Sequence, residues 1–222
     1  MLGSVLGDVL PSALAVALSP IPIVAVVLVL GGHRPRSAGG GFALGWIAGL
    51  SAVAVVVVLL VGAGGDSGGE GSGVAWLKTG VGVLLLLMAV GQWRKRPRGG
   101  EEPEMPAWMA GVDSATPARA TLLGAALSAA NPKNLALTFA ASASIAEAGL
   151  DGADTAIAVV VFVAVGSATV AGAALAYLVA PARAARPLAA IRRFMSRHNA
   201  VIMAAVLALI GAKLLAEGLG GV

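Results

Sequence analysis

Cysteine is absent from this chain of 222 residues, and charged residues are scarce. Without cysteine the protein has no disulfide, no thiolate metal site, no redox-active dithiol and no cysteine nucleophile. Charged residues make up 12% of the chain, against about 25% in a typical soluble domain. Hydrophobic residues reach 58%, and the mean hydropathy is +0.91. This composition is typical of an integral membrane protein.

Acidic residues and histidines are missing from the middles of the apolar runs. Asp8, Glu147 and Glu217 lie near the ends of such runs, and His33 and His198 lie beside basic loops. The sequence therefore offers no buried carboxylate relay for protons and no cluster of metal ligands. It also contains no phosphate-binding loop and no nucleophile elbow. We expect a protein that is not an enzyme and that holds no metal ion and no cofactor.

The apolar runs predict an all-α membrane protein with six transmembrane helices. Each run approaches or exceeds the about 20 residues that cross a bilayer, and the chain leaves no room for a separate soluble domain. The first run lacks a basic stretch before it and continues past any small-residue cleavage pattern, so we expect an uncleaved span. The predicted spans are 9–30, 41–62, 74–92, 120–147, 154–180 and 199–217.

The basic residues predict the orientation of the spans. Twelve of the fifteen Lys and Arg residues lie on one side of the predicted membrane, in the loops after spans one, three and five. The opposite loops carry Asp66, Glu70, Asp151 and Asp154. The positive-inside rule therefore predicts a bacterial inner-membrane protein with both termini outside. Because topology explains the pI of about 10.1, we expect no nucleic-acid partner.

Two apolar runs are interrupted at their middles by a helix-capping residue followed by proline. The interruptions are Ser19-Pro20-Ile21-Pro22 and Asn131-Pro132-Lys133-Asn134. Ser and Asn are good N-caps and proline fits the first helical position, so each motif predicts the start of a new half-helix. Matching interruptions in two halves of a membrane protein indicate a transporter's binding site. For the first motif taken alone, a proline kink that only shapes helix packing is as good an interpretation as a break that lines a cavity.

The positions of these interruptions predict a 3+3 inverted repeat with proline-broken helices in spans one and four. Spans one to three enter from outside and spans four to six from inside, and each interruption lies in the first span of its half. We predict one membrane domain over 1–222. Within it, 1–92 is the first three-helix repeat, 93–119 a cytoplasmic linker rich in proline and glycine, and 120–222 the second repeat.

Lys133 lies near the centre of the predicted fourth span. An ammonium at that depth is costly and needs a partner or a wet cavity. It also follows a predicted helix start, where free N–H groups and the helix dipole add positive potential. No acidic residue is near it in the sequence, so the pattern favours binding of a phosphate, sulfate or carboxylate. Capping of carbonyls freed by its own break and snorkelling to the membrane surface are the structural alternatives.

Three further patterns concern packing and the membrane surface. Small residues repeat every fourth position in two ridges, which predict close helix contacts within a protomer or across a homodimer. Residues 183–197 place apolar side chains among five arginines, which predicts either an amphipathic segment on the inner leaflet or simple positive-inside charge. The ridges are Gly41, Gly45 and Gly49 in span two, and Ala200, Ala204, Ala208, Ala212 and Ala216 in span six.

Three sequence motifs resemble those of the GAP family, the glycolipid- and sulfolipid-addressing proteins of the LysE exporter superfamily. They are SPIPIVAVVLVL in span one, PAWMAGVD before span four and ANPKNLAL within it. The resemblance extends over most of the chain and implies a six-span inner-membrane protein of the bacterial envelope that moves lipids or glycolipids towards the cell surface. It points to a substrate site made of Ser19, Pro20, Pro22, Asn131, Pro132, Lys133 and Asn134.

The expected function is therefore movement of a lipid or glycolipid with an anionic head group, by alternating access at a midplane site. Two alternatives are open: export of a small polar or carboxylate-bearing solute, and an accessory scaffold in a lipid-export complex. A side opening wide enough for an acyl chain favours lipid, a closed polar cavity favours a small solute, and a solid bundle favours a scaffold.

Overall fold

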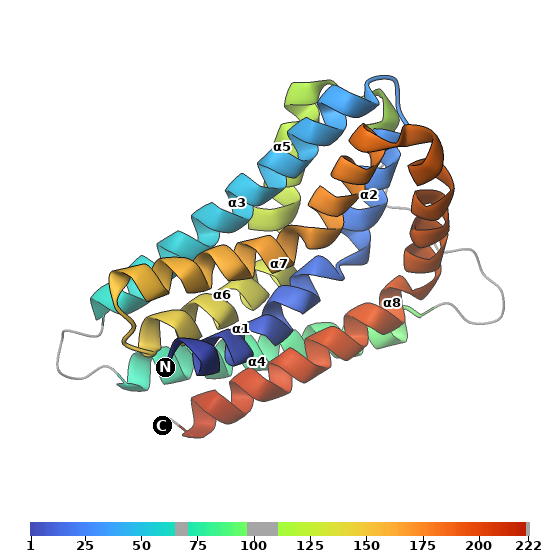
Figure 1. The fold of residues 1–222 in the computed structure, drawn as a ribbon. Helices are drawn as coiled ribbons and strands as arrows, with labels where there is room; N and C mark the ends of the chain where they lie inside the picture. Colours follow the sequence, from blue (N-terminus) through green and yellow to red (C-terminus); the bar gives the residue numbers. More distant parts are fainter. Residues whose placement is uncertain (65–70, 97–110, 221–222) are drawn as a thin grey trace.

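A computed structural model describes residues 1–64, 71–96 and 111–220, and within these residues the chain is helical with no strand. Figure 1 shows the helices as an elongated bundle with both termini at one end. The elements are α1 (Leu2–Ala17), α2 (Pro20–Leu30), α3 (Pro35–Gly64), α4 (Gly71–Arg94), η2 (Val112–Ser114), α5 (Pro117–Ala129), α6 (Pro132–Glu147), α7 (Gly152–Val179) and α8 (Pro181–Gly220).

Four of these helices, α3, α4, α7 and α8, are long and apolar enough to cross a membrane. The pair α1 and α2 makes a fifth candidate, bent by 49° at its break. Large apolar side chains such as Leu44, Leu60 and Leu87 are exposed on the outside of the bundle, where a bilayer would cover them. The chain is therefore a multi-pass helical membrane protein.

The expected span at 120–147 is divided into two short helices. Its halves, α5 and α6, have 13 and 16 residues, each less than the about 20 that a straight span requires. They do not count among the candidate spans of the described residues, so the six-span prediction is not confirmed. The physical reason is the break itself, since Pro132 has no N–H to continue the helix from α5.

Both predicted breaks are confirmed where the prolines lie. Span one stops at Ala17 and resumes at Pro20, and the chain from α5 resumes at Pro132. In each case the residue before the proline has an extended backbone, as the proline ring requires. Proline then occupies the first turn of the new helix, where a missing N–H costs nothing.

The glycine ridge on α3 lets the backbone of α5 pack directly against the backbone of α3. A Cβ atom added to Gly45 would lie 1.9 Å from the Thr121 carbonyl oxygen. A Cβ atom on Gly49 would lie 2.3 Å from Ser128 Oγ, and one on Gly124 of α5 would lie 2.1 Å from the Phe42 carbonyl oxygen. The ridge thus works within the protomer, and it fixes α5, and with it the start of the second break, on α3.

Helix α8 is bent and packs over much of its length on α4. In Figure 1 its first part runs across the end of the bundle where α7 ends, and its second part runs beside α4. The close contacts come from Gly82, Gly211 and Gly218, whose added Cβ atoms would lie 3.0 Å or less from the partner helix. The predicted alanine ridge is buried only in its first part: Ala200 and Ala204 are buried, whereas Ala212 and Ala216 are exposed.

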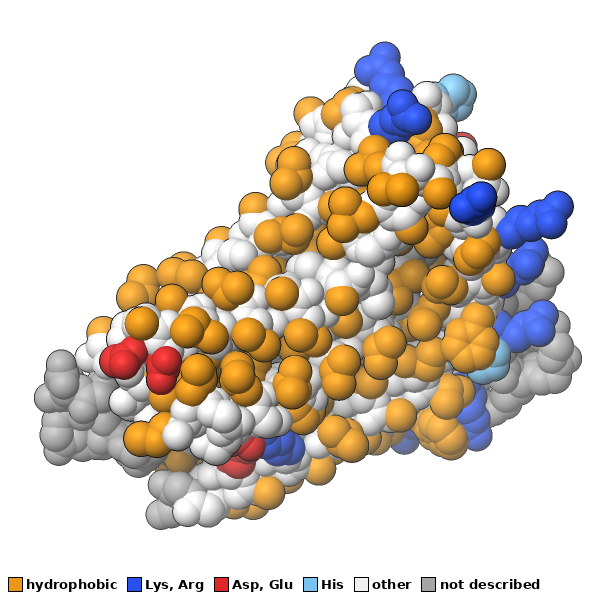
Figure 2. Space-filling view, viewed as in Figure 1, with side chains coloured by type: hydrophobic (Ala, Val, Ile, Leu, Met, Phe, Trp, Pro, Cys, Tyr) orange, Lys and Arg blue, Asp and Glu red, His pale blue; other side chains and the backbone are white. Residues whose placement is uncertain are grey.

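Charge separates to the two ends of the bundle. Figure 2 shows basic side chains gathered at one end and most of the visible acidic ones at the other. The acidic end holds Asp8, Glu147 and Glu217 together with Lys78 and Lys213. The basic end holds the turn 31–34 and the first part of α8.

Candidate functional site

The two helix breaks meet inside the bundle through Lys133. Its Nζ donates hydrogen bonds to the Ala15 carbonyl oxygen at 2.8 Å and to Ser19 Oγ at 2.6 Å. Lys133 belongs to the first turn of α6, whereas Ala15 belongs to the last turn of α1 and Ser19 to the break between α1 and α2. The side chain is 1% exposed, so it does not snorkel, and it caps a carbonyl of the other break and not one of its own.

The carbonyls at the end of α1 are satisfied one by one. The Val16 carbonyl accepts from the Ser19 N–H at 3.1 Å, because Pro20 has no N–H to offer it. The Ala15 carbonyl accepts from Lys133, and the Ala17 carbonyl accepts from Thr169 Oγ1 of α7 at 2.5 Å. Side chains from α6 and α7 thus replace the helical hydrogen bonds that the break removes.

Asn134 links the second break to the first. Its Nδ2 donates to the Leu127 carbonyl oxygen of α5 at 2.8 Å, and its Oδ1 accepts from Ser19 Oγ at 3.1 Å. Asn131 caps α6 as predicted, since its Oδ1 accepts from the Lys133 N–H at 3.1 Å. Ser19 holds the N-cap position of α2 but makes no capping bond, because its hydroxyl serves Lys133 and Asn134 instead.

The predicted site residues divide into a buried centre and an exposed edge. Ser19, Pro20, Pro22, Lys133 and Asn134 are all buried, whereas Asn131 is half-buried and Pro132 is exposed. The Lys133 ammonium has only neutral oxygen partners, and no carboxylate of the described residues forms an ion pair with it. This junction (Ala15, Ser19, Lys133 and Asn134) is therefore a buried centre of uncompensated positive charge.

A stripe of buried polar side chains leads from the junction along α6. Asn134, Thr138 and Ser142 are each 0% exposed and follow one another at intervals of four residues, so they share one face of the helix. The Thr138 and Ser142 hydroxyls have no hydrogen-bond partner among the described residues. A polar group entering the bundle along this face would find two uncommitted hydroxyls.

At the acidic end, ion pairs join four helices. Lys78 of α4 contacts Glu147 of α6 at 2.5 Å and Glu217 of α8 at 3.5 Å. Lys213 of α8 contacts Glu217 at 3.4 Å and Asp8 of α1 at 3.8 Å. Asp8, Lys78, Glu147 and Glu217 line a polar pocket of about 360 Å³, together with Ser4 and Ser144.

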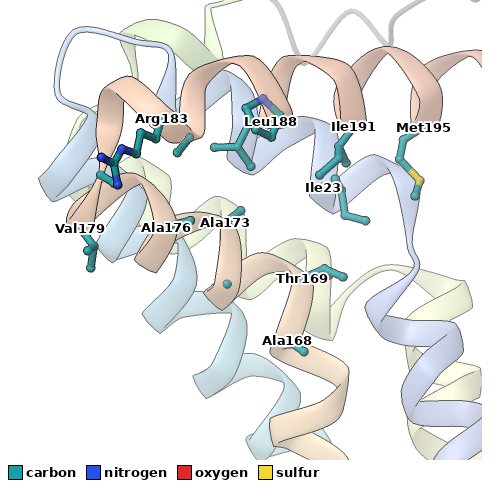
Figure 3. Close-up of a pocket in the computed structure, with 14 residues that line it drawn as sticks. Ile23, Ala168, Thr169, Ala173, Ala176, Val179, Arg183, Leu188, Ile191 and Met195 are labelled. Atoms are coloured by element: carbon teal, nitrogen blue, oxygen red, sulfur yellow. The ribbon is translucent and has the colours of Figure 1, made fainter.

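An apolar groove of about 670 Å³ lies near the basic end, between α2, α7 and the first part of α8. Figure 3 shows α7 and α8 diverging, with Arg183 and Val179 near the point where they join and Ile23 and Met195 farther along. Arg183 is the single charged residue that lines it. The remaining lining residues are Ala168, Thr169, Gly172, Ala173, Ala176, Ala180, Ala184, Pro187, Leu188 and Ile191.

Two features of these sites escaped prediction from the sequence. The ion pairs of Lys78 were missed, although Lys78, Glu147 and Glu217 were all predicted on the same side of the membrane. The groove was also missed, although Ala168, Gly172, Ala176 and Ala180 repeat every four positions on α7. The repeat on α7 predicts a helix face made of small side chains. It does not predict which neighbouring helix diverges from that face and leaves a groove.

Comparison with known proteins adds a family. A family model described as Sap, sulfolipid-1-addressing protein, matches residues 9–220. No curated protein and no solved structure matches the chain. The predicted relation to the LysE exporter superfamily is not tested by this match and stays a prediction.

Proposed function

Because the chain belongs to the sulfolipid-1-addressing protein family, we propose that it is a transporter that moves a lipid or glycolipid with an anionic head group towards the cell surface. We place it in the bacterial inner membrane with the basic end in the cytoplasm and both termini outside, as the positive-inside rule predicts. The cargo is exposed alternately to the two sides of the membrane at the junction around Lys133.

The observation that carries this proposal is the environment of the Lys133 ammonium. A charge buried in a membrane protein normally pairs with an opposite charge, and unpaired ones mark paths for substrates or ions. Here the ammonium is 1% exposed, and a carbonyl and a hydroxyl are its only partners within the part of the chain that the structure describes. An anionic head group would supply the missing opposite charge, and the Thr138 and Ser142 hydroxyls would supply further donors along α6.

The proposed architecture is a six-span 3+3 inverted repeat, in which α1–α4 correspond to α5–α8. Reciprocal packing supports it: α1 contacts α6 and α7, while α5 contacts α2 and α3. The last helix of each half, α4 and α8, also pack on each other. In this arrangement α5 and α6 together form the fourth span, and rocking of one half against the other opens the junction to one side at a time.

The test is Lys133→Met with transbilayer movement of a fluorescent phosphatidylglycerol measured in reconstituted vesicles. Methionine keeps a similar length and apolar stem but removes the charge, so we expect lipid movement to be lost from a folded protein. Lys133→Arg should retain part of the activity, because the charge stays while its geometry changes. Lys213→Met is the matched control, since it removes an ammonium at the acidic end, outside the junction.

Each alternative function has its own outcome in this experiment. Full lipid movement by Lys133→Met would refute the anion site at the junction. Movement of a small carboxylate but not of lipid by the unmodified protein would favour a solute exporter. If the unmodified protein moves neither compound, the accessory-scaffold hypothesis is favoured.

A further inference from the structure

The groove between α2, α7 and α8 has the shape and lining of a site for one long apolar ligand chain. Its wall on α7 is built from small residues, among them Gly172, Ala173 and Ala176, so no side chain of that helix fills the space. Its opposite wall on α8 carries Leu188, Ile191 and Met195, which Figure 3 shows along one side of the opening. A volume of about 670 Å³ with this lining suits a long apolar chain and not a polar solute.

The groove offers a cation at one end and no other uncommitted polar side chain. Of its two polar lining residues, Thr169 already donates its hydroxyl to the Ala17 carbonyl. Arg183 is exposed and forms no ion pair with any carboxylate of the described residues. Its guanidinium can therefore donate paired hydrogen bonds to a phosphate or sulfate group.

We propose that this groove binds one acyl chain of a membrane lipid and that Arg183 binds the anionic head group of that lipid. The occupant comes from the bilayer leaflet at the basic end of the bundle. The site deepens the proposed function and rests on it as the place where the cargo enters. Through Thr169 and Ile23 the groove also borders the α1–α2 break, which holds Ser19 and thus the junction.

Head-group charge, and not chain burial, must provide the selectivity of this site. An acyl chain leaving the bilayer exchanges one apolar environment for another, so its transfer supplies little net driving force. One basic residue near the membrane surface favours an anionic over a neutral lipid by about fivefold. The preference for an anionic head group is therefore the property that separates this site from nonspecific lipid contact.

The experiment measures lipids that stay bound to the purified protein in a nonionic detergent by native mass spectrometry. The probes are phosphatidylglycerol and phosphatidylcholine with identical acyl chains. We expect one tightly bound lipid per chain, with about fivefold preference for phosphatidylglycerol. Arg183→Gln should abolish the preference, and Arg186→Gln, which removes a neighbouring arginine outside the groove, should retain it. Ala176→Trp should block binding of both lipids, whereas Ala164→Trp on the same helix outside the groove should not.

Three results would overturn the assignment. They are a preference that survives Arg183→Gln, an equal loss in Arg186→Gln, and native binding by Ala176→Trp. Elution volume and thermal midpoint of each variant show that it is folded. Because this assay does not depend on transport, the two proposals can be refuted separately. Lipid bound in the groove together with full transport by Lys133→Met would refute only the junction mechanism. An empty groove together with Lys133-dependent transport removes only the entry site.

Discussion

A single methyl group at Gly45 tests the close crossing of α3 and α5. The added Cβ atom of Gly45→Ala would lie 1.9 Å from the Thr121 carbonyl oxygen and 2.8 Å from its carbonyl carbon. Ordinary contact requires about 3.5 Å, so the two helices must separate by roughly 1.5 Å. Both clashing atoms of Thr121 are backbone atoms, and no flexible side chain can move away instead. We expect Gly45→Ala to cost about 1–3 kcal/mol of stability, the usual range for overpacking.

The assay is a thermal scan of the purified protein in detergent, followed by tryptophan fluorescence. For a chain of this size, 1 kcal/mol corresponds to a shift of about 2–4 °C, so Gly45→Ala should lower the midpoint by roughly 2–12 °C. Gly40→Ala on the same helix is the matched control, because nothing lies within 4 Å of its added Cβ atom. Alanine is the better helix former by about 1 kcal/mol, so this control should leave the midpoint unchanged or raise it.

The comparison of the two variants decides the outcome. If Gly45→Ala melts at or above the temperature of Gly40→Ala, the backbones of α3 and α5 do not approach as closely as the structure shows. The fixed position of α5 would then lose its explanation. A lower midpoint for Gly45→Ala alone would confirm the crossing that sets Leu127, at the end of α5, within reach of Asn134.

Two further predictions concern the ion pairs and the topology. Lys78→Met leaves Glu147 and Glu217 without their shared cation. It should lower the free energy of unfolding by about 1–3 kcal/mol, a value between the costs of breaking surface and buried ion pairs. Lys213→Met, in a more exposed pair, should cost less than about 1 kcal/mol in the same thermal scan, and equal effects would contradict this ranking. Single cysteines at Arg36 and Ala190 should be protected from an impermeant reagent in intact cells, while one at Gly152 should react; the reverse pattern would overturn the orientation.

Local features of the fold could be predicted from the sequence because their causes are local. A proline after Ser19 and after Asn131 removes a helical donor wherever the segment lies, so both breaks were confirmed. The glycine ridge on α3 was also confirmed. Three glycines at helical spacing leave a groove on the helix surface, and α5 packs into it. The alanine ridge is buried only at Ala200 and Ala204 and exposed at Ala212 and Ala216, because alanine is common throughout this chain and tolerates exposure to lipid as well as packing.

The centre of the candidate site could be predicted only in part, because its contacts join residues more than 100 positions apart. Lys133 was identified as an unusual buried charge, but its bonds to Ala15 and Ser19 depend on how the halves dock. Thr169 and Arg183 gave no signal of their own. A threonine in an apolar helix and an arginine in a basic loop are both ordinary until the fold places them beside the break and the groove.

The two breaks complement each other chemically, and this explains why a costly ammonium is kept inside the bundle. The first break has a surplus of acceptors, because Pro20 and Pro22 remove the donors that the carbonyls of Val16 and Leu18 would otherwise meet. The second break supplies a donor through the Lys133 ammonium, which meets the Ala15 carbonyl, and an acceptor through Asn134 Oδ1, which meets the Ser19 hydroxyl. An unsatisfied buried group costs about 1–3 kcal/mol, so each break stabilises the other.

That same complementarity couples cargo binding to a change of shape in the proposed mechanism. The Lys133 ammonium is held between the Ala15 carbonyl and Ser19 Oγ, at 2.8 and 2.6 Å. An anionic head group that binds Lys133 competes with both oxygens, because a charged acceptor makes the stronger hydrogen bond. Once the ammonium turns to the head group, Ala15 loses its main donor and the link between α6 and the first break weakens. In the proposed mechanism, the arriving anion therefore releases one contact between α6 and the first break, and its departure restores that contact.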